Sequence, residues 1–251
     1  MQVVYHEDYK QVYTTDPASA SGRIEAIENA LRGKVTFLTP LAASAEDIRR
    51  VHTPDHINSV TREGVYDIAA LAAGGAIKAA QIGLAEPCFA VIRPPGHHAS
   101  AGAAWGFCYF NNMAIALTRL KHDGKIKKAF ILDFDLHFGD GNVNILGGRE
   151  YITILNPEAH DRNGYLKTVA AHSARTDADM IAVSAGFDNH EDDWGGLLKT
   201  EDYYYMGKLV REAAIRNQGG CFGILEGGYN HTVLGLNVLA FIEGLEQKPG
   251  A

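Results

Sequence analysis

The sequence contains few cysteines and no long apolar segment. Its three cysteines, Cys88, Cys108 and Cys221, are odd in number and lack metal-ligand spacing. This pattern argues against a disulfide framework and favours free thiols in a reducing cytoplasm. No apolar run approaches the roughly 18 residues that span a bilayer, and residues 1–7 lack the basic and apolar regions of a secretory signal. We therefore expect a cytoplasmic location and no membrane partner.

Basic residues are also fewer than acidic residues. The chain of 251 residues has 23 lysines and arginines against 30 aspartates and glutamates, which gives a formal net charge of -7. A general nucleic-acid binder needs a basic face to neutralise phosphates, so we expect no nucleic-acid partner. An acidic surface suits a cationic substrate, although charge alone is a weak indication.

The chain lacks internal repeats and linker-like stretches, so we expect one domain over residues 1–251. Apolar runs typical of strands buried on both faces alternate with helical patterns. This alternation predicts a three-layer α/β/α fold with a mostly parallel central sheet. The predicted strands are Cys88–Ile92, Ala129–Leu132, Ile152–Leu155, Met180–Ser184 and Cys221–Leu225. The predicted helices are Val65–Leu84, Asn112–Lys121, Glu201–Asn217 and Thr232–Glu246.

Four of these strands run directly into polar segments, at residues 93–98, 133–137, 185–188 and 226–229. In open α/β sheets, ligands bind beyond the carboxyl ends of the strands. We therefore expect the four segments to converge on one site.

The segments carry a candidate metal site. In an extended stretch, Asp135 and His137 point to the same side, and Asp188 follows another strand as a third ligand. Such an Asp-x-His pair alone is more often a solvated turn. Two carboxylates and one imidazole leave positions open for water and substrate, as a catalytic ion requires. The set accepts Zn²⁺, with Fe²⁺ or Co²⁺ as alternatives.

Acid–base groups flank the candidate ligands. His97 and His98 follow a Pro-Pro-Gly turn, and pairing with the nearby Asp133 and Asp140 would fix their tautomers. Tyr229, after Gly227-Gly228, could direct a hydroxyl at a developing oxyanion. Each feature alone has a plainer structural interpretation, such as a core histidine or a tyrosine that closes a turn. Their combination is what indicates a catalytic site.

Taken together, these segments resemble the histone deacetylase and acetylpolyamine amidohydrolase superfamily, which has an arginase-like α/β fold. The matching stretches, in the order of the family, are Arg93–His98, Gly106–Asn112, Asp133–Gly141, Ser184–Asp188 and Leu225–Tyr229. Val51–Asp55 and Ala72–Ala76 also look like family segments, so the resemblance covers most of the chain. It implies a metal-dependent deacetylase, a hydrolase of linear amide bonds.

The resemblance assigns a role to each residue. Asp135, His137 and Asp188 match the zinc ligands; His97 and His98 match the tandem histidines, backed by Asp133 and Asp140. Tyr229 matches the tyrosine that polarises the acetyl carbonyl. Phe107, with Gly106 and Gly227, belongs to the substrate tunnel. A structural K⁺ is expected beside Asp133. In the expected mechanism, a metal-activated water attacks the acetyl group, and His98 carries its proton to the leaving amine while His97 tunes the local charge.

The sequence departs from the family after residues 152–155, where many relatives carry a long insertion that forms a second tunnel wall. Here the connection is short, and no aromatic-Pro-Gly match is present. Either Tyr165, Trp105 or Trp194 substitutes, or a neighbouring subunit of a homo-oligomer closes the pocket, or the site is more open. The acidic run at residues 191–193 is either a rim that attracts a cationic amine or a solvated turn that braces the loop.

Two other functions remain as alternatives. An arginase-like ureohydrolase would need further bridging carboxylates, but Asp188 is followed by Asn189 and His190. A non-catalytic protein that binds an acyl ligand should have lost at least one of the named groups, and all are present. Both acetyl-lysine and small acetylated amines such as acetylpolyamines carry the scissile amide, so the substrate stays open.

Overall fold

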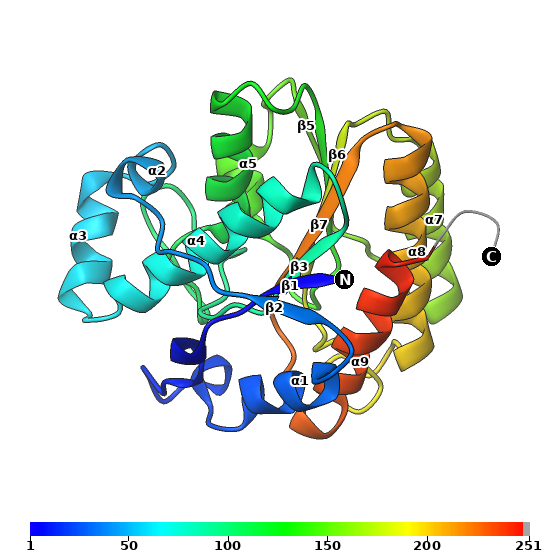
Figure 1. The fold of residues 1–251 in the computed structure, drawn as a ribbon, viewed down its shortest axis with the longest axis horizontal. Helices are drawn as coiled ribbons and strands as arrows, with labels where there is room; N and C mark the ends of the chain where they lie inside the picture. The colour runs from blue at the N-terminus through cyan, green and yellow to red at the C-terminus, as the bar shows by residue number, and fades with distance from the viewer. Residues whose placement is uncertain (248–251) are drawn as a thin grey trace.

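The computed structural model describes residues 1–247 and has a seven-stranded, wholly parallel sheet at its centre (Figure 1). The strands lie in the order β2-β1-β3-β7-β6-β4-β5, and each pairs in parallel with its neighbours. Their bounds are β1 Gln2–Val4, β2 Thr36–Leu38, β3 Cys88–Ala90, β4 Ala129–Asp133, β5 Ile152–Leu155, β6 Met180–Ala185 and β7 Gly220–Leu225. The predicted fold class is confirmed.

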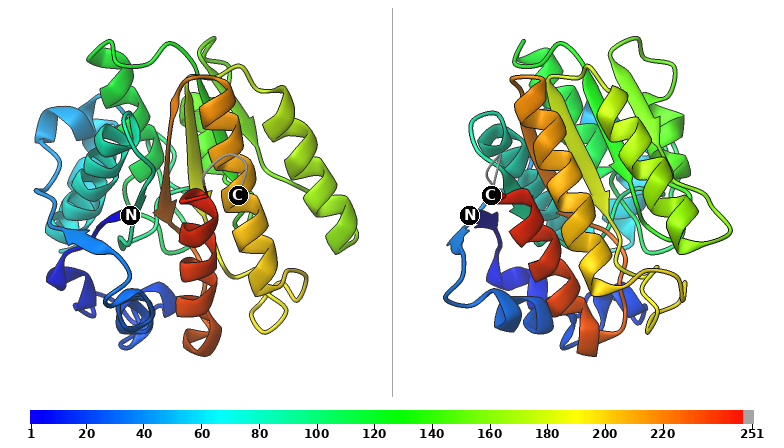
Figure 2. Two further views of the ribbon diagram at one scale, coloured as in Figure 1. Left: turned by 45° about the vertical axis from the view of Figure 1, so that its right-hand side comes forward. Right: turned by 90° about the vertical axis from the view of Figure 1, so that its right-hand side faces the viewer.

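Helices cover both faces of the sheet (Figure 2). Helices α4 and α5 pack together on one face, with α4 against β3 and β7, while α8 and α9 lie on the other face beside α1 and α7. The α-helices of the described part are α1 Arg23–Leu31, α2 Ala45–Arg49, α3 Pro54–Arg62, α4 Tyr66–Gly83, α5 Asn112–His122, α6 Asp140–Leu146, α7 Arg162–Arg175, α8 Thr200–Arg216 and α9 His231–Leu245. None of the helices in residues 1–247 has both the length and the apolar character that a membrane crossing requires.

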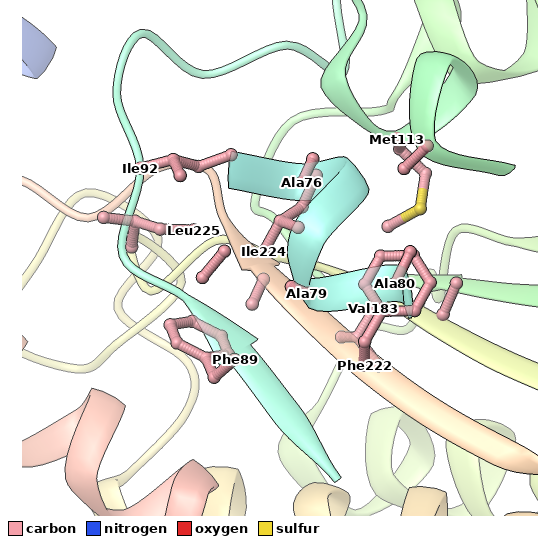
Figure 3. Packing of buried hydrophobic residues seen from close by; sticks show 14 of the residues in the cluster. Ala76, Ala79, Ala80, Phe89, Ile92, Met113, Val183, Phe222, Ile224 and Leu225 are labelled. Carbon is pink, nitrogen blue, oxygen red and sulfur yellow. The ribbon is translucent and has the colours of Figure 1, made fainter. Parts of the chain in front are cut away.

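Small side chains bring α4 close to the sheet. Figure 3 shows Ala76, Ala79 and Ala80 of α4 lying over Phe222 and Ile224 of β7. All five residues are fully buried. Because alternate residues of a strand point to the same face, Phe222 and Ile224 both meet the helix. The result is a closely packed apolar layer between α4 and β7. This packing fixes the position of β7 and therefore of the loop that follows it.

The predicted elements are confirmed to within two residues at their ends. Two short N-terminal strands and five helices were not predicted from the sequence: β1, β2, α1, α2, α3, α6 and α7. Strands of three residues are too short to show a periodicity. Residues 248–251 of the domain predicted over residues 1–251 lie outside the described part, and its extent stays a prediction.

The contact between α8 and α9 depends on glycine. A Cβ atom added to Gly207 would lie 2.3 Å from the carbonyl oxygen of Phe241 and 3.1 Å from the Leu245 nitrogen. Gly207→Ala is therefore expected to destabilise the protein by about 1–3 kcal/mol, although alanine favours the helix itself. Each kcal/mol should lower Tm by about 2–4 °C in calorimetry. Gly102→Ala, where the new Cβ meets nothing closer than 3.7 Å, is the control, and an equal Tm for both variants would contradict the prediction.

Candidate metal centre and active site

The four polar segments meet at one edge of the sheet. Strands β3, β7, β6 and β4 are consecutive neighbours and run in the same direction. The residues that follow them therefore lie side by side, although up to 130 positions separate partners such as Gly96 and Glu226 along the chain. The expected convergence on one site is confirmed by this topology.

The three predicted metal ligands come together in the structure. The Nδ1 atom of His137 lies 3.2 Å from Oδ1 of Asp135 and 3.2 Å from Oδ2 of Asp188. Ligands about 2.0 Å from a tetrahedral zinc ion lie about 3.3 Å apart, so this spacing fits one ion. Oδ2 of Asp188 is buried and has no hydrogen bond of good geometry from the described residues, although the His137 nitrogen lies 3.2 Å away. A buried carboxylate oxygen is costly unless a metal ion, a protonated histidine or a proton neutralises its charge.

Backbone groups fix the other carboxylate oxygens. The Gly227 amide donates to Oδ2 of Asp135 at 2.8 Å, and the Leu136 amide donates to Oδ1 of Asp188 at 3.0 Å. A Cβ atom at Gly227 would lie 2.6 Å from an oxygen of each aspartate. Only glycine therefore allows the loop after β7 to approach both carboxylates. Gly227, which was predicted to bind substrate, lies against the candidate metal ligands and also lines the cavity described below.

The charges of this group indicate a site for a cation. Hydrogen bonds to Asp135, and then to Asp188, raise the pKa of His137 to about 10. Burial and the neighbouring charge of Asp135 raise the pKa of Asp188. In the metal-free protein, the imidazolium of His137 thus neutralises part of the carboxylate charge that a metal ion would otherwise balance.

His97 lies between two buried carboxylates. Its Nδ1 atom is 3.3 Å from Oδ2 of Asp133, and its Nε2 atom is 3.7 Å from Oδ1 of Asp135. Burial alone would lower the pKa of His97, but Asp135 and Asp133 together raise it well above its usual value. His97 is therefore suited to carry a positive charge. The Nδ2 group of Asn142 donates to the same Asp133 oxygen at 2.9 Å and holds it in place.

His98 has the opposite character. Its Nδ1 atom lies 2.7 Å from Oδ1 of Asp140, and burial, followed by the charge of His97, lowers its pKa to about 4. The contact with a carboxylate assigns the ring proton to Nδ1 and leaves Nε2 as an acceptor. The two adjacent histidines, with ring centroids 4.0 Å apart, thus divide into one cation and one neutral base.

Glu226, for which the sequence predicted no role, also belongs to the group of buried side chains at this edge of the sheet. It is fully buried, and one carboxylate oxygen accepts from the amides of Gly96, at 2.6 Å, and His97, at 3.2 Å. Burial raises its pKa to about 7. Glu226 thereby ties the histidine loop to the end of β7. An acid directly after a buried strand was the available signal.

A small cavity of about 110 Å³ opens beside these groups. Aromatic side chains form much of its lining, and among them is Phe107, whose role as a wall of the substrate tunnel stays a prediction. Gly106, also predicted, lines the cavity with a φ of +62°, and a Cβ there would lie 3.1 Å from His98. The full lining is Pro95, His97, His98, Trp105, Gly106, Phe107, Cys108, His137, Trp194, Gly227 and Tyr229.

Two of the three candidate replacements for the second tunnel wall line the cavity. Trp105 and Trp194 do so, each with 53% of its surface exposed. Tyr165 does not, because it is buried in the core and its hydroxyl donates to the carbonyl of Phe134 at 3.2 Å. Trp194 stacks on Tyr229 at 4.2 Å between ring centroids, and Phe107 meets the edge of Tyr229 at 5.6 Å.

Within the acidic run at residues 191–193, the structure shows the bracing role for Asp193, while the rim that would attract an amine stays a prediction. One oxygen of Asp193 accepts from the amides of Tyr229 and Asn230, both at 2.8 Å, so Asp193 braces the loop that carries the tyrosine. Glu191 and Asp192 are exposed.

Desolvation raises the pKa of Tyr229, and the negative charges of Asp135 and Asp188 raise it further. Its hydroxyl therefore stays protonated and can donate a hydrogen bond.

Asp133 has one oxygen without a partner among the described residues. Its Oδ1 atom is buried and makes no hydrogen bond there, while Oδ2 accepts from His97 and Asn142. This is the carboxylate beside which a K⁺ was expected. An unpaired buried oxygen is consistent with such an ion, since alkali and alkaline-earth cations prefer oxygen ligands.

Comparisons with known proteins were made by sequence and by structure. The model of the family described as "Histone deacetylase domain" matches residues 60–168 and 157–245. A "Probable deacetylase" of Archaeoglobus fulgidus is 30% identical over 91% of this chain and 81% of its own length. A "Histone deacetylase-like amidohydrolase" of Pseudomonas aeruginosa is 27% identical over 91% of this chain and 78% of its own. The crystal structure of the HDA15 HD domain has the same fold, with a TM-score of 0.82, 23% identity, and coverage of 97% of this chain and 88% of that chain.

The family model matches in two pieces that overlap at residues 157–168. This segment directly follows β5 and includes the start of α7. It is the connection that the sequence analysis identified as short. The division of the match therefore falls where the sequence lacks the insertion that many relatives carry.

Proposed function

The chain belongs to the histone deacetylase domain family, and on that premise we propose that it removes acetyl groups from acetylated amines with the help of one divalent metal ion. The observation that carries the proposal is the group of Asp135, His137 and Asp188 at the spacing of metal ligands, next to two histidine–carboxylate pairs. We propose Zn²⁺ as the ion, with Fe²⁺ or Co²⁺ as alternatives. Bound there, it would polarise the acetyl carbonyl and lower the pKa of a water.

The surrounding residues supply the proton transfers. His98 is neutral, and its Nε2 atom accepts a proton from the attacking water and returns it to the leaving amine. Asp140 keeps the other ring nitrogen protonated and orients the ring. The positive charge of His97 stabilises the negative charge that develops on the substrate, and Tyr229 donates a hydrogen bond to the same oxygen. We also propose a structural K⁺ beside Asp133 and a cytoplasmic location, consistent with three free, buried cysteines.

The substrate is an acetylated amine with a slender chain. The cavity lined by Phe107, Trp105 and Trp194 is small and largely aromatic, which suits an acetyl group on an unbranched alkyl amine. Acetyl-lysine and acetylpolyamines both meet this description. The two indoles that line the cavity favour a substrate with a second positive charge.

A panel of substrates tests the proposal. Protein with quantified metal should release acetate from acetylated spermidine, acetylated putrescine or acetyl-lysine peptides, and a chelator should stop the reaction. Turnover of the small amines alone would identify a polyamine deacetylase, and turnover of the peptides would identify a protein deacetylase. No turnover at one metal ion per chain would overturn the proposal and favour a non-catalytic acyl-binding protein.

A ureohydrolase is not supported by the same group of residues. A two-metal site needs bridging carboxylates, but the only other metal-ligand group found in residues 1–247 is His97, Cys108 and Glu226. Its glutamate already accepts two backbone hydrogen bonds. The urea-releasing reaction should therefore be undetectable.

Metal binding should depend on pH through His137. The pKa of this residue is about 10 in the metal-free protein, so at pH 7 the imidazole carries a proton that the metal must displace. We expect about one proton to be released per ion, and the apparent affinity to rise about tenfold per pH unit between pH 6 and 8. Calorimetric titrations in two buffers with different heats of ionisation count the protons. An affinity that does not change with pH would contradict this assignment.

A further inference from the structure

Trp105 makes an unusual set of contacts for an exposed side chain. Its indole Nε1 group donates to Oδ2 of Asp140 at 2.8 Å, and its ring lies over the His98 ring at 3.8 Å between centroids, with an interplanar angle of 33°. We propose that Trp105 is a positioning residue that holds the Asp140–His98 pair in its working geometry. The proposal rests on the proposed function, in which His98 carries the proton.

The hydrogen bonds divide the Asp140 carboxylate between two partners. Oδ1 lies 2.7 Å from Nδ1 of His98, and Oδ2 accepts from Trp105. With both oxygens engaged, the carboxylate cannot rotate without breaking one hydrogen bond. The indole plane restrains the imidazole at the same time. One side chain therefore restrains both members of the pair.

The other histidine–carboxylate pair explains why Trp105 is needed. The Asp133 side chain is fully buried, and Asn142 holds the oxygen that faces His97. The Asp140 side chain is 43% exposed, at the first turn of α6. Water competes for such a carboxylate, and its rotamers are free unless a neighbour fixes them. Trp105 does for the exposed pair what burial and Asn142 do for the buried one.

The backbone is arranged to allow this contact. Gly106, the next residue, has a φ of +62°, which turns the chain directly after Trp105. The Gly106 Cα is so close to His98 that a Cβ would lie 3.1 Å from Cδ2 of the ring. A glycine at this position therefore lets the loop pass beside the imidazole while the indole covers it.

The contact itself can be tested without turnover. The chain has two tryptophans, so a ¹⁵N–¹H spectrum of the metal-free protein should show two indole signals. Asp140→Asn replaces the charged acceptor and should shift the Trp105 indole signal, while the Trp194 signal stays in place. If neither signal moves, the Trp105–Asp140 hydrogen bond is absent in solution, and the proposal is overturned.

The positioning role is tested with a double-mutant cycle in the metal-loaded enzyme. Trp105→Phe keeps an aromatic ring over His98 but removes the donor, and kcat should fall about 10- to 100-fold, the range for a hydrogen bond to a charged group. KM, metal content and Tm should stay close to wild type. When Trp105→Phe is introduced into the Asp140→Asn variant, it should lower kcat little further, because Trp105 acts through Asp140.

Trp194→Phe is the matched control, since Trp194 is equally exposed but stacks on Tyr229. The fold-decrease in kcat caused by Trp194→Phe should be the same in the wild-type protein and in Asp140→Asn. Additive effects of Trp105→Phe and Asp140→Asn, or a wild-type kcat in Trp105→Phe, would overturn the positioning role. Failure of the proposed function has a different signature: wild-type protein with bound metal would turn over none of the acetylated amines, while the indole signal would still respond to Asp140→Asn.

Discussion

Asp188→Asn is expected to abolish turnover and to remove the stabilisation that zinc gives the protein. The substitution keeps the shape of the side chain but replaces an anionic ligand by a neutral one. We expect the affinity for Zn²⁺ to fall by more than about 100-fold, beyond what substitutions of residues around a metal site cost. Zinc at about 100 times its Kd should stabilise the wild-type protein by about 2.7 kcal/mol, which corresponds to a Tm increase of roughly 5–11 °C.

The metal-free variant should be at least as stable as the metal-free wild type. Burial and the charge of Asp135 raise the pKa of Asp188. A carboxyl whose pKa is raised in the folded protein is ionised at a cost at neutral pH, so the loss of this charge should not lower Tm. Scanning calorimetry with and without zinc measures both effects. Asp192→Asn, in an exposed turn, is the control and should keep the zinc-dependent increase.

Two results would contradict this assignment. A full zinc-dependent Tm increase in Asp188→Asn would mean that the ion binds elsewhere. A large loss of Tm in the metal-free variant would mean that Asp188 mainly holds the fold, through its hydrogen bond from the Leu136 amide. Turnover distinguishes the two explanations. It stays unaffected if the ion binds elsewhere, but it falls if Asp188 mainly holds the fold.

Much of the sheet could be predicted from the sequence because its central strands are buried on both faces. Runs such as residues 129–133 and 180–185 carry few polar side chains, and a polar segment begins where each strand ends. Parallel strands bring such ends together, so the convergence of Asp135 and Asp188 follows from the order of elements. Strands β1 and β2 could not be found in this way, since three residues carry no usable pattern.

Contacts made by loops were harder to predict. The stacking of Trp105 on His98 depends on the path of residues 99–106, which tertiary contacts determine. Asp193 lies in an acidic run of the kind that is usually solvated, yet it accepts two backbone hydrogen bonds from the loop of Tyr229. Neither periodicity nor spacing distinguishes such a brace from an exposed charge. The sequence therefore indicated the candidate site residues more clearly than the neighbouring contacts that hold these residues in position.

Tyr229→Phe is expected to lower kcat about 10²–10³-fold, the typical effect of removing one hydrogen-bond donor to a developing oxyanion. The ring contacts with Trp194 and Phe107, and the Asp193 brace on the backbone, do not involve the hydroxyl. Phenylalanine should therefore occupy the same place, with Tm and zinc affinity close to wild type. Because the raised pKa keeps the hydroxyl protonated, the alkaline side of the wild-type pH profile should not report Tyr229.

Steady-state kinetics of the metal-loaded variant would measure this effect on kcat and KM separately. Tyr205→Phe, in which the tyrosine is 40% exposed on α8, is the matched control and should retain full activity. A fall in kcat with little change in KM would place the lost interaction in the transition state, where the carbonyl oxygen becomes negative. If Tyr229→Phe kept most of its turnover, the hydroxyl would have no catalytic role, and the stabilisation of the oxyanion would fall to the metal ion and the positive charge of His97.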